Sequence, residues 1–356
     1  MTRVSHPAPS PWPEILDDAR HYPSPHNSQP IKVRPLDAER ADVFYDLDLG
    51  LPAESFGIPF GHVCAGVFLH GLGVVARARG WRVVEELDDA DMDFAAADRL
   101  HRIGRVTLVP ASDDDGGPSA AQAAADHRAF LERRTSRRPY TPRLVGPEVL
   151  DGAARLAADA GHALGVTADP AHVKALVHIN QRTLFDDLRN DAVYGEIMHW
   201  LRFTKAEAAA TGDGLSAETM LVPGRVLRFA MRHRGLWDAP VVGALIRSVY
   251  LRTMRGVRQL AWLTGPFDSP HDYLEAGRVF LGIWLHLERN GAVLHPFGTV
   301  ITNPRSHAAF VERLGIAEAD GRMAWMLFRL GHSPEPPLAH RRPLASTMLE
   351  PGTRQR

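Results

Sequence analysis

The sequence predicts an α+β protein whose chain contains two pseudo-repeated halves. Two windows, 65–80 and 276–291, carry the same helical pattern at a constant offset of 211 residues. Each window begins Ala-Gly, places apolar residues at i, i+3, i+4, i+7 and i+11, and ends at a glycine that can cap a helix. Strand candidates, apolar and bounded by turn residues, lie at 105–109, 259–263 and 323–330. A buried helix in each half and several short strands together favour this fold class.

In the first half, the repeated helix at 65–76 is followed by an apolar segment at 81–84. An acidic, glycine-containing turn at 111–118 is the best candidate for a linker between the halves. A helix is expected directly after it, at 120–131, where alanines dominate the sequence.

The second half contains two further helical patterns, 173–189 and 225–234, on either side of an irregular stretch at 204–225. We expect this stretch to be an insertion that covers the functional site. The second repeated helix, 276–287, is followed by the apolar segment 292–294. The predicted domain bounds are a flexible N-terminal extension, a first half and a second half, at 1–17, 18–118 and 119–356.

The composition excludes several classes of protein. With 356 residues and 45% apolar content, the chain can build one large core or two modest ones. A net charge of −1 provides no global field for nucleic acid or an anionic membrane. No apolar run approaches the roughly 18 residues of a membrane span. The single Cys64 forms no internal disulfide, and no CxxC or HExxH motif indicates a metal site. A cytoplasmic protein without nucleic-acid, membrane or metal partners is expected.

One polar turn near the N-terminus has the composition of a ligand-binding loop. Its prolines restrict the backbone, while its serine, asparagine and glutamine can form hydrogen bonds with a heteroaromatic ligand. An ordinary surface loop is the alternative interpretation. The candidate ligand-binding residues are Pro23, Ser24, Pro25, Asn27 and Gln29.

A second segment, 133–140, has the composition of an anion site. Four guanidinium groups bracket two hydroxyl groups just after the predicted helix at 120–131, an arrangement that suits a phosphate monoester and is too compact for a nucleic-acid groove. A solvated charge run at a helix end is the alternative. The candidate residues are Arg133, Arg134, Thr135, Ser136, Arg137 and Arg138.

Taken together, the two segments resemble the flavin-binding segments of the nitroreductase superfamily. Members carry an Arg-Arg-Ser/Thr-x-Arg-x-aromatic stretch that holds the FMN phosphate and a Pro-Ser-x-x-Asn-x-Gln-Pro-Trp loop that contacts the flavin across a dimer interface. The order of the segments resembles the Acg-like branch, and the resemblance extends from about Pro23 to Pro343. Ile31 stands where the family usually has tryptophan, so the resemblance does not extend to the contacts of that ring, and the smaller side chain is expected to open space for an unusual substrate.

The resemblance implies a fold in which long central helices form the core of a homodimer, here fused into one chain. It also implies that 204–225 acts as a lid, and that a further stretch runs along the flavin ring and supplies a backbone N–H to flavin N5. That stretch is His295, Pro296, Phe297 and Gly298, and the basic residues that reach back to the phosphate are Arg341 and Arg342. Each flavin-binding segment occurs once, so we expect one FMN site and a monomer that resembles a dimer.

The function implied by the resemblance is that of an FMN-dependent oxidoreductase. The flavin carries the redox chemistry, so no catalytic side chain is expected. NAD(P)H is the expected electron donor and a small molecule the expected substrate, with natural-product biosynthesis as one setting. The alternatives are a protein that sequesters FMN without turning it over and a scaffold that has lost the flavin. The motif Gly71-Leu72-Gly73 lies inside a predicted helix, so it is not a dinucleotide fingerprint.

Overall fold

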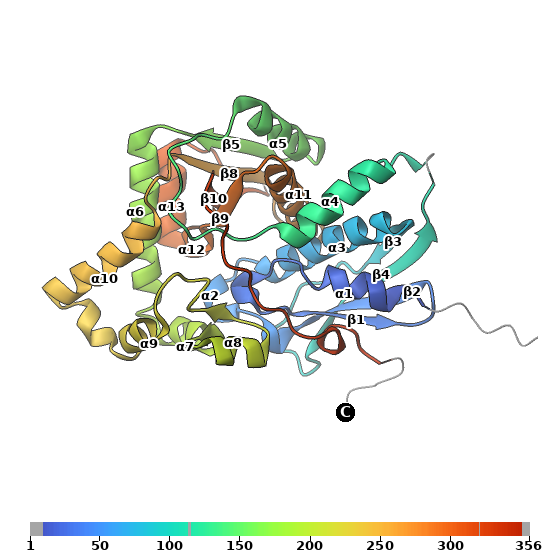
Figure 1. Ribbon diagram of the computed structural model, residues 1–356, viewed down its shortest axis with the longest axis horizontal. Helices are drawn as coiled ribbons and strands as arrows, with labels where there is room; N and C mark the ends of the chain where they lie inside the picture. Colours follow the sequence, from blue (N-terminus) through green and yellow to red (C-terminus); the bar gives the residue numbers. More distant parts are fainter. Residues whose placement is uncertain (1–9, 113–114, 320, 351–356) are drawn as a thin grey trace, which may run out of the picture.

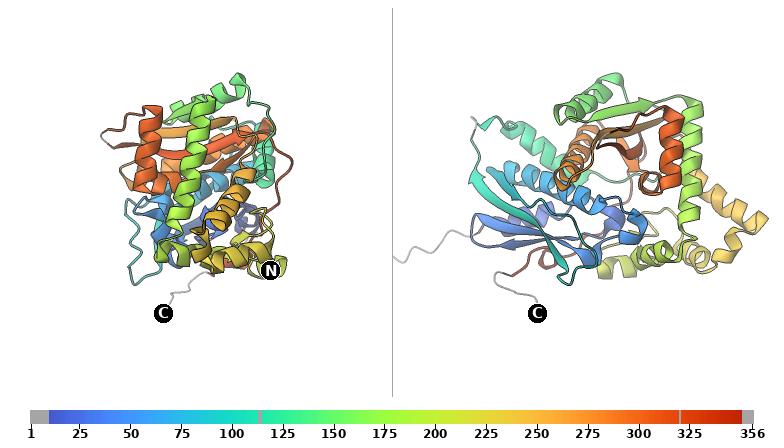
Figure 2. Two further views of the ribbon diagram at one scale, coloured as in Figure 1. Left: turned by 90° about the vertical axis from the view of Figure 1, so that its left-hand side faces the viewer. Right: turned by 180° about the vertical axis from the view of Figure 1, so that it is seen from behind.

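The computed structural model describes residues 10–112, 115–319 and 321–350. Two four-stranded antiparallel sheets lie on opposite sides of a layer of helices (Figures 1 and 2). The first sheet has the order β1-β2-β4-β3, with β1 (Ile31–Pro35), β2 (Arg40–Asp46), β3 (Trp81–Leu87) and β4 (Leu100–Pro110). The second has the order β5-β8-β10-β9, with β5 (Ala163–Thr167), β8 (Gln259–Pro266), β9 (Val293–Pro296) and β10 (Arg322–Gly331).

The two sheets have the same strand order and the same position for their longest helix. Helix α3 (Phe60–Ala78) connects the second strand of the first sheet to the third, and α11 (Pro270–Arg289) does so in the second sheet. A shorter helix precedes the first strand of each sheet and packs on the long helix, α1 (Trp12–Ala19) on α3 and α5 (Pro147–Asp159) on α11. Helix α4 (Ala120–Glu132) contacts both long helices.

Helices α3 and α11 touch through their backbones at two glycines. A methyl group on Gly66 would lie 1.9 Å from the carbonyl oxygen of Leu274, and one on Gly277 would lie 2.1 Å from the carbonyl oxygen of Val63. Both glycines therefore exclude any larger residue. Each member of one contact stands 211 residues from its counterpart in the other, which is the offset of the sequence repeat.

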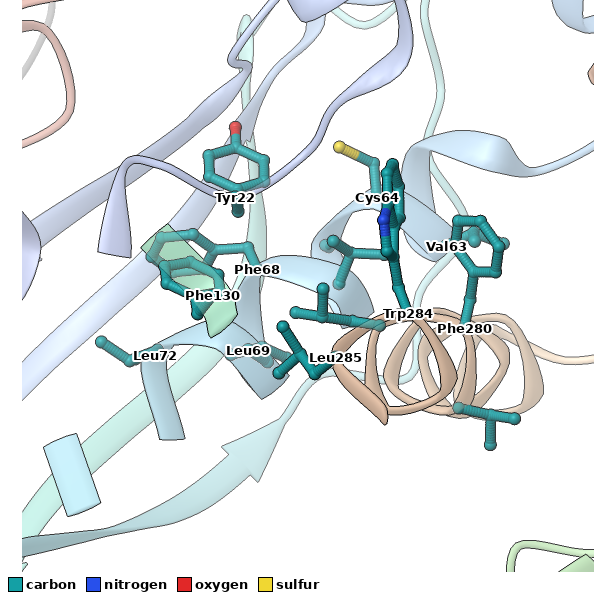
Figure 3. Close-up of a cluster of buried hydrophobic side chains, with 14 of the residues drawn as sticks. Tyr22, Val63, Cys64, Phe68, Leu69, Leu72, Phe130, Phe280, Trp284 and Leu285 are labelled. Atoms are coloured by element: carbon teal, nitrogen blue, oxygen red, sulfur yellow. The ribbon is translucent and has the colours of Figure 1, made fainter. Parts of the chain in front are cut away.

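The main core lies around this crossing (Figure 3). Side chains from α3, α4 and α11 interlock there, with Tyr22 packing edge-on against Phe68. Burial raises the pKa of the Cys64 thiol in the same core, so this cysteine is unreactive. Helix α3 is long and apolar enough to span a membrane by length and composition, which corrects the expectation that no apolar run is long enough; 67% of it is buried in this core.

A large insertion separates β5 from β8, where the first sheet has only a short hairpin between β1 and β2. It comprises seven elements and one 3₁₀ turn. They are α6 (Pro170–Asp187), α7 (Asp191–Trp200), β6 (Leu201–Arg202), α8 (Lys205–Thr211), β7 (Leu215–Ser216), α9 (Gly224–Arg232), a 3₁₀ turn (Arg234–Trp237) and α10 (Pro240–Thr253). The insertion is thus wider than 204–225. That stretch is not irregular throughout either, because a capping box between Thr204 and Glu207 starts α8.

The remaining elements are short, apart from the second helix after β9. They are α2 (Pro52–Ser55), α12 (Gly298–Thr302), α13 (Pro304–Leu314) and the 3₁₀ turns Pro25–Asn27, Leu47–Leu49 and Leu344–Ser346. The predicted helices at 65–76, 120–131, 173–189 and 276–287 and the three predicted strands are confirmed. The predicted linker lies between β4 and α4, with 113–114 outside the described residues.

Two expectations about the N-terminal region are wrong. The ordered structure begins before residue 18, because α1 starts at Trp12 and fully buries Trp12, Ile15 and Leu16. Ile31, which stands where the family that the sequence resembles usually has tryptophan, does not open space for a substrate. Its side chain is 1% exposed and belongs to the core, and its N–H donates to the hydroxyl of Tyr22 at 3.0 Å. A tryptophan at this position would overpack the core.

Candidate functional site

The loop at 23–29 is a tight turn held in an unusual backbone conformation. His26, Asn27 and Gln29 have φ values of 48°, 56° and 53°, which non-glycine residues rarely adopt. The hydroxyl of Ser24 accepts a hydrogen bond from the N–H of Gln29 at 2.9 Å and closes the turn. Such strain persists only where surrounding contacts enforce it, and it is concentrated at functional sites.

Asn27 and Gln29 bind the C-terminal segment and the insertion. The side-chain oxygen of Asn27 accepts from Nη1 of Arg341 at 2.7 Å, and its nitrogen donates to the carbonyl of His340 at 3.0 Å. The side chain of Gln29 donates to the carbonyl of Gly212 at 2.9 Å and accepts from the N–H of Arg342 at 3.0 Å. The predicted loop is therefore the point at which three distant segments meet.

Arg133 and Arg341 converge on this loop. Both guanidinium groups donate to the carbonyl of His21, Arg341 at 3.1 Å. Arg133 is 5% exposed and lies over the ring of Trp284, 5.1 Å from its centre. Burial lowers the pKa of Arg133 well below its usual value, and the positive charge of Arg341 adds to this effect. Burial lowers the pKa of Arg341 to about 10. Nε of both residues is buried without a hydrogen-bond partner.

The segment 133–138 also lies along β9, next to the stretch predicted to line a flavin. Thr135 forms a parallel bridge with Leu294, and the N–H of Ser136 donates to the carbonyl of Leu294 at 3.0 Å. The hydroxyl groups of Ser136 and Ser333 are 2.7 Å apart. In the stretch itself, the N–H of Phe297 donates to Leu327 at 2.7 Å and is therefore already engaged by β10.

The other residues of the 295–298 stretch end strand β9 and start helix α12. Pro296 pairs with Phe328 across β9 and β10, and Gly298 is the first residue of α12.

Arg134 and Arg138 point to a different group, the loop after β10. Arg134 forms an ion pair with Glu335 at 2.9 Å, and Nε of Arg138 donates to the carbonyl of Glu335 at 2.8 Å. The Glu335 side chain is 75% exposed. An exposed ion pair of this kind contributes only about 0–1 kcal/mol, so a phosphate can replace the carboxylate.

A second basic cluster, formed by Arg137, His295 and Arg329, lies on the other flank of the segment. Arg329 pairs with His295 across the strands and donates to the carbonyl groups of Ser136 at 2.8 Å and Thr253 at 2.7 Å. Burial lowers the pKa of Arg137 to about 10 and that of His295 well below its usual value, and the neighbouring positive charges lower both further. Nδ1 of His295 and Nε of Arg329 are buried without partners.

Arg329 is a site residue that sequence reasoning missed. The available signal was a single basic residue in the apolar strand 323–330. Arg342, by contrast, was predicted to reach a phosphate, yet its guanidinium forms an ion pair with Asp213 of the insertion, at 2.9 Å from Nε.

Contacts thus link the four predicted segments in series. The loop at 23–29 binds residues 341–342, Arg341 and Arg133 share the carbonyl of His21, and the segment 133–138 lies along β9 beside the stretch 295–298. Positive charge is in excess there. Five arginines of this site form no ion pair with any carboxylate of the described residues: Arg133, Arg137, Arg138, Arg329 and Arg341. Buried charge of one sign requires a counter-charge, so the arrangement favours an anionic ligand. The described residues contain no group of three histidine, cysteine, aspartate or glutamate side chains that could hold a metal ion.

A cavity of about 290 Å³ adjoins the site on the side of the insertion. His340, next to Arg341, lines it together with residues of the insertion between β6 and the start of α9, including Phe203, Lys205 and Glu218. A smaller cavity of about 220 Å³ lies apart from the site, between Arg143 and the start of α5.

An acidic group beneath the loop at 23–29 supports a prediction about pH. His26 bonds to Glu54, and Asp187 lies close enough to Glu54 to feel its charge. Asp187 is 3% exposed; burial raises its pKa to about 6, although Asn303 donates to one of its oxygens at 2.6 Å. Because the folded-state pKa exceeds the unfolded one, the folded state binds more protons between about pH 4 and 6, and stability falls as pH rises through that window.

We therefore expect Asp187→Asn to stabilise the protein at about pH 8 by roughly 2 kcal/mol and to change stability little at about pH 4. Urea unfolding at both pH values measures the difference. Equal effects at the two pH values would show that burial does not raise the pKa of Asp187.

Among known proteins, the chain is similar to solved structures at low sequence identity. No protein-family profile matches the chain, and no curated protein matches it. Among solved structures, an FMN-dependent nitroreductase of Mycobacterium smegmatis, crystallised with NADPH, is 15% identical, with a TM-score of 0.35 over 60% of this chain and 89% of that one. A nitroreductase of Desulfitobacterium hafniense with bound FMN is 14% identical, with a TM-score of 0.35 over 60% and 93%. A nitroreductase-like protein of Bacillus cereus is 15% identical, with a TM-score of 0.36 over 63% and 94%. These three solved neighbours of the chain are thus nitroreductases or nitroreductase-like proteins.

Proposed function

We propose that this protein is an FMN-dependent oxidoreductase of the nitroreductase type, with NAD(P)H as electron donor. The observation that carries the proposal is that contacts link four sequence-distant segments at a site with unpaired guanidinium groups. The sequence resemblance assigns each of those segments to flavin binding. Two of the solved neighbours were crystallised with NADPH or with bound FMN.

The residues present fit the two ends of the cofactor. Arg134, Arg138 and the hydroxyl of Ser136 would hold the phosphate, since charge-assisted hydrogen bonds from arginine suit its oxygens. Arg133 and Arg341, with unpaired Nε atoms, add positive charge at the loop. Asn27 and the backbone of 295–298 would orient the ring, and the insertion would exclude water. When bound, the flavin supplies hydride transfer, so the role of the chain is to bind, orient and shield.

We further propose that the chain derives from a fused homodimer. Three observations support this origin: the two sheets share one strand order, the long helices occupy equivalent positions, and the Gly66 and Gly277 contacts are related by the repeat offset. The interface that relatives bury between subunits is then internal to one chain.

A single site follows from the fusion, because each flavin-binding segment occurs once. The purified protein is expected to carry about one FMN per chain and to remain a monomer, as measured by flavin absorbance against protein concentration and by light scattering. Two FMN per chain would contradict the single site, and an obligate dimer would contradict the fusion.

The loop offers a direct test of flavin binding. Asn27→Ala removes the acceptor of Arg341 and the donor to His340, and a lost charge-assisted bond of this kind is worth about 1.5–3 kcal/mol. We expect FMN affinity to fall by at least tenfold, measured by fluorescence titration of the apoprotein. Unchanged affinity and an unchanged flavin spectrum would place the flavin elsewhere.

One observation favours a second candidate function, the sequestering of FMN without turnover. Gln29 bonds to Gly212, and Arg342 bonds to Asp213, so the insertion is fastened over the loop. A closed site would hold FMN and exclude NAD(P)H. Anaerobic stopped-flow measurement of flavin bleaching by NADH and NADPH separates the two: rapid bleaching supports the oxidoreductase, and persistent oxidised flavin supports sequestration.

A further inference from the structure

The end of the insertion forms a basic arm that projects from the molecule. It comprises α9, the following 3₁₀ turn, α10 and the connection to β8, residues 224–258. Figure 1 and the right-hand view of Figure 2 show α10 extending away from the sheets and central helices. None of the residues proposed to hold FMN lies in this arm.

The charge of the arm is strongly biased. Residues 224–258 contain eight arginines and one aspartate, with no lysine or glutamate, which gives +7 in a chain whose total is −1. Arg228 and Arg234 are paired with Glu207 and Asp191 outside the arm. Five exposed arginines form no ion pair in the described part of the chain: Arg225, Arg232, Arg252, Arg255 and Arg258. The net charge of the whole protein, −1, gives no indication of this local positive charge.

The same arm exposes large apolar side chains. Val226 and Phe229 of α9 are each 55% exposed, and Val241 and Leu245 of α10 are 80% and 59% exposed. Elsewhere in the described residues, only Leu338 is exposed to a comparable degree, at 59%. Met231 of α9 and Trp237 of the 3₁₀ turn are buried and pack into the core of the insertion. The exposed apolar groups are therefore additional to those that hold the arm together.

This combination identifies the chemistry of the partner. Nucleic-acid backbones attract arginines but offer no place for exposed valine, leucine and phenylalanine side chains. A second copy of the arm would bring two charges of +7 together. An anionic lipid surface satisfies both features, because arginines meet the headgroups while apolar side chains enter the boundary of the acyl chains.

We propose that the arm of residues 224–258 binds reversibly to anionic membrane surfaces. The contact is peripheral and involves no spanning helix. It requires neither FMN nor turnover, so it stands or falls independently of the proposed function. The attraction depends on charge and is screened by salt, whereas the apolar contribution persists.

The test is co-sedimentation of the purified full-length protein with lipid vesicles. We expect at least about tenfold more binding to phosphatidylcholine vesicles containing phosphatidylserine than to phosphatidylcholine alone, and loss of most of the binding when salt rises from about 0.1 M to 0.5 M. The double variant Arg225→Gln/Arg232→Gln and the single variant Phe229→Ser should each reduce binding severalfold. Circular dichroism confirms that each variant remains folded, which exposed positions allow.

A matched control removes two exposed arginines from other surfaces. Arg82→Gln/Arg143→Gln changes the net charge equally and should leave vesicle binding unchanged. If both double variants lose vesicle binding equally, the binding depends on the overall charge of the protein and not on the arm, and the proposal is overturned. Absence of binding to anionic vesicles would also overturn it, as would binding that ignores lipid charge. Light scattering that shows dimerisation through the arm, abolished by Phe229→Ser without any vesicle binding, would assign the surface to self-association instead.

Discussion

Replacing Gly66 with alanine is expected to lower the free energy of unfolding by about 3 kcal/mol or more, because a methyl group would lie 1.9 Å from a backbone carbonyl. A flexible side chain could move aside, but the obstacle is the main chain of α11 at Leu274. The two long helices would therefore have to separate, and the packing of the surrounding core would be lost along with the contact.

The measurement is urea unfolding of Gly66→Ala and Gly277→Ala beside a control in the same helix. Gly73 also lies in the interior of α3 but has no atom within 4 Å of a methyl group placed there. Gly73→Ala should stabilise the protein by about 0.5–1 kcal/mol, since alanine loses less conformational freedom in a helix. If all three variants behave alike, the helices are not in backbone contact at Gly66 and Gly277.

The two central helices could be predicted from the sequence, but the contact at which they cross could not. Their apolar pattern and the 211-residue offset are local properties, visible without any tertiary structure. That Gly66 and Gly277 form the contact was not visible, because each is one of several glycines in or near its helix and the pattern gives no preference between Gly66 and Gly71. Only the packing of α3 on α11 distinguishes them.

The extent of the insertion escaped prediction for a related reason. The first helices and first strands of the two halves are offset by 135 and 132 residues, from Trp12 to Pro147 and from Ile31 to Ala163. The offset becomes 211 only after the insertion. A repeat sought at one constant spacing therefore finds α3 and α11 and misses the shorter elements before them.

The candidate site could be predicted as segments but not as individual contacts. The segments at 23–29 and 133–138 were singled out from composition and resemblance, and the structure brings them together through His21 and Arg341. Which arginine is buried depends on long-range packing. Arg133 is buried over the ring of Trp284, whereas Arg134, its neighbour in the chain, forms an ion pair with the exposed Glu335. Adjacent residues of one type carry no local signal for that difference.

The second large effect is expected at the proposed phosphate end. Arg134→Ala/Arg138→Ala should weaken FMN binding by several kcal/mol in total, since each charge-assisted hydrogen bond to phosphate contributes about 1.5–3 kcal/mol. Riboflavin, which lacks the phosphate, should bind the variant and the wild type almost equally. Titration of the apoprotein with both ligands, followed by fluorescence, gives the two affinities from one preparation.

Glu335→Ala distinguishes binding of the phosphate from support of the fold. Arg134 and Arg138 both contact Glu335 in the structure, so their removal also detaches the loop after β10. If the two arginines act only by attaching this loop, Glu335→Ala would weaken FMN and riboflavin binding together, because it removes the carboxylate of the Arg134–Glu335 ion pair. If the arginines serve the phosphate, Glu335→Ala removes a competing carboxylate and should leave FMN affinity unchanged or raise it slightly. An equal loss for both ligands in the arginine variant, reproduced by Glu335→Ala, would remove these two residues from the proposed phosphate site.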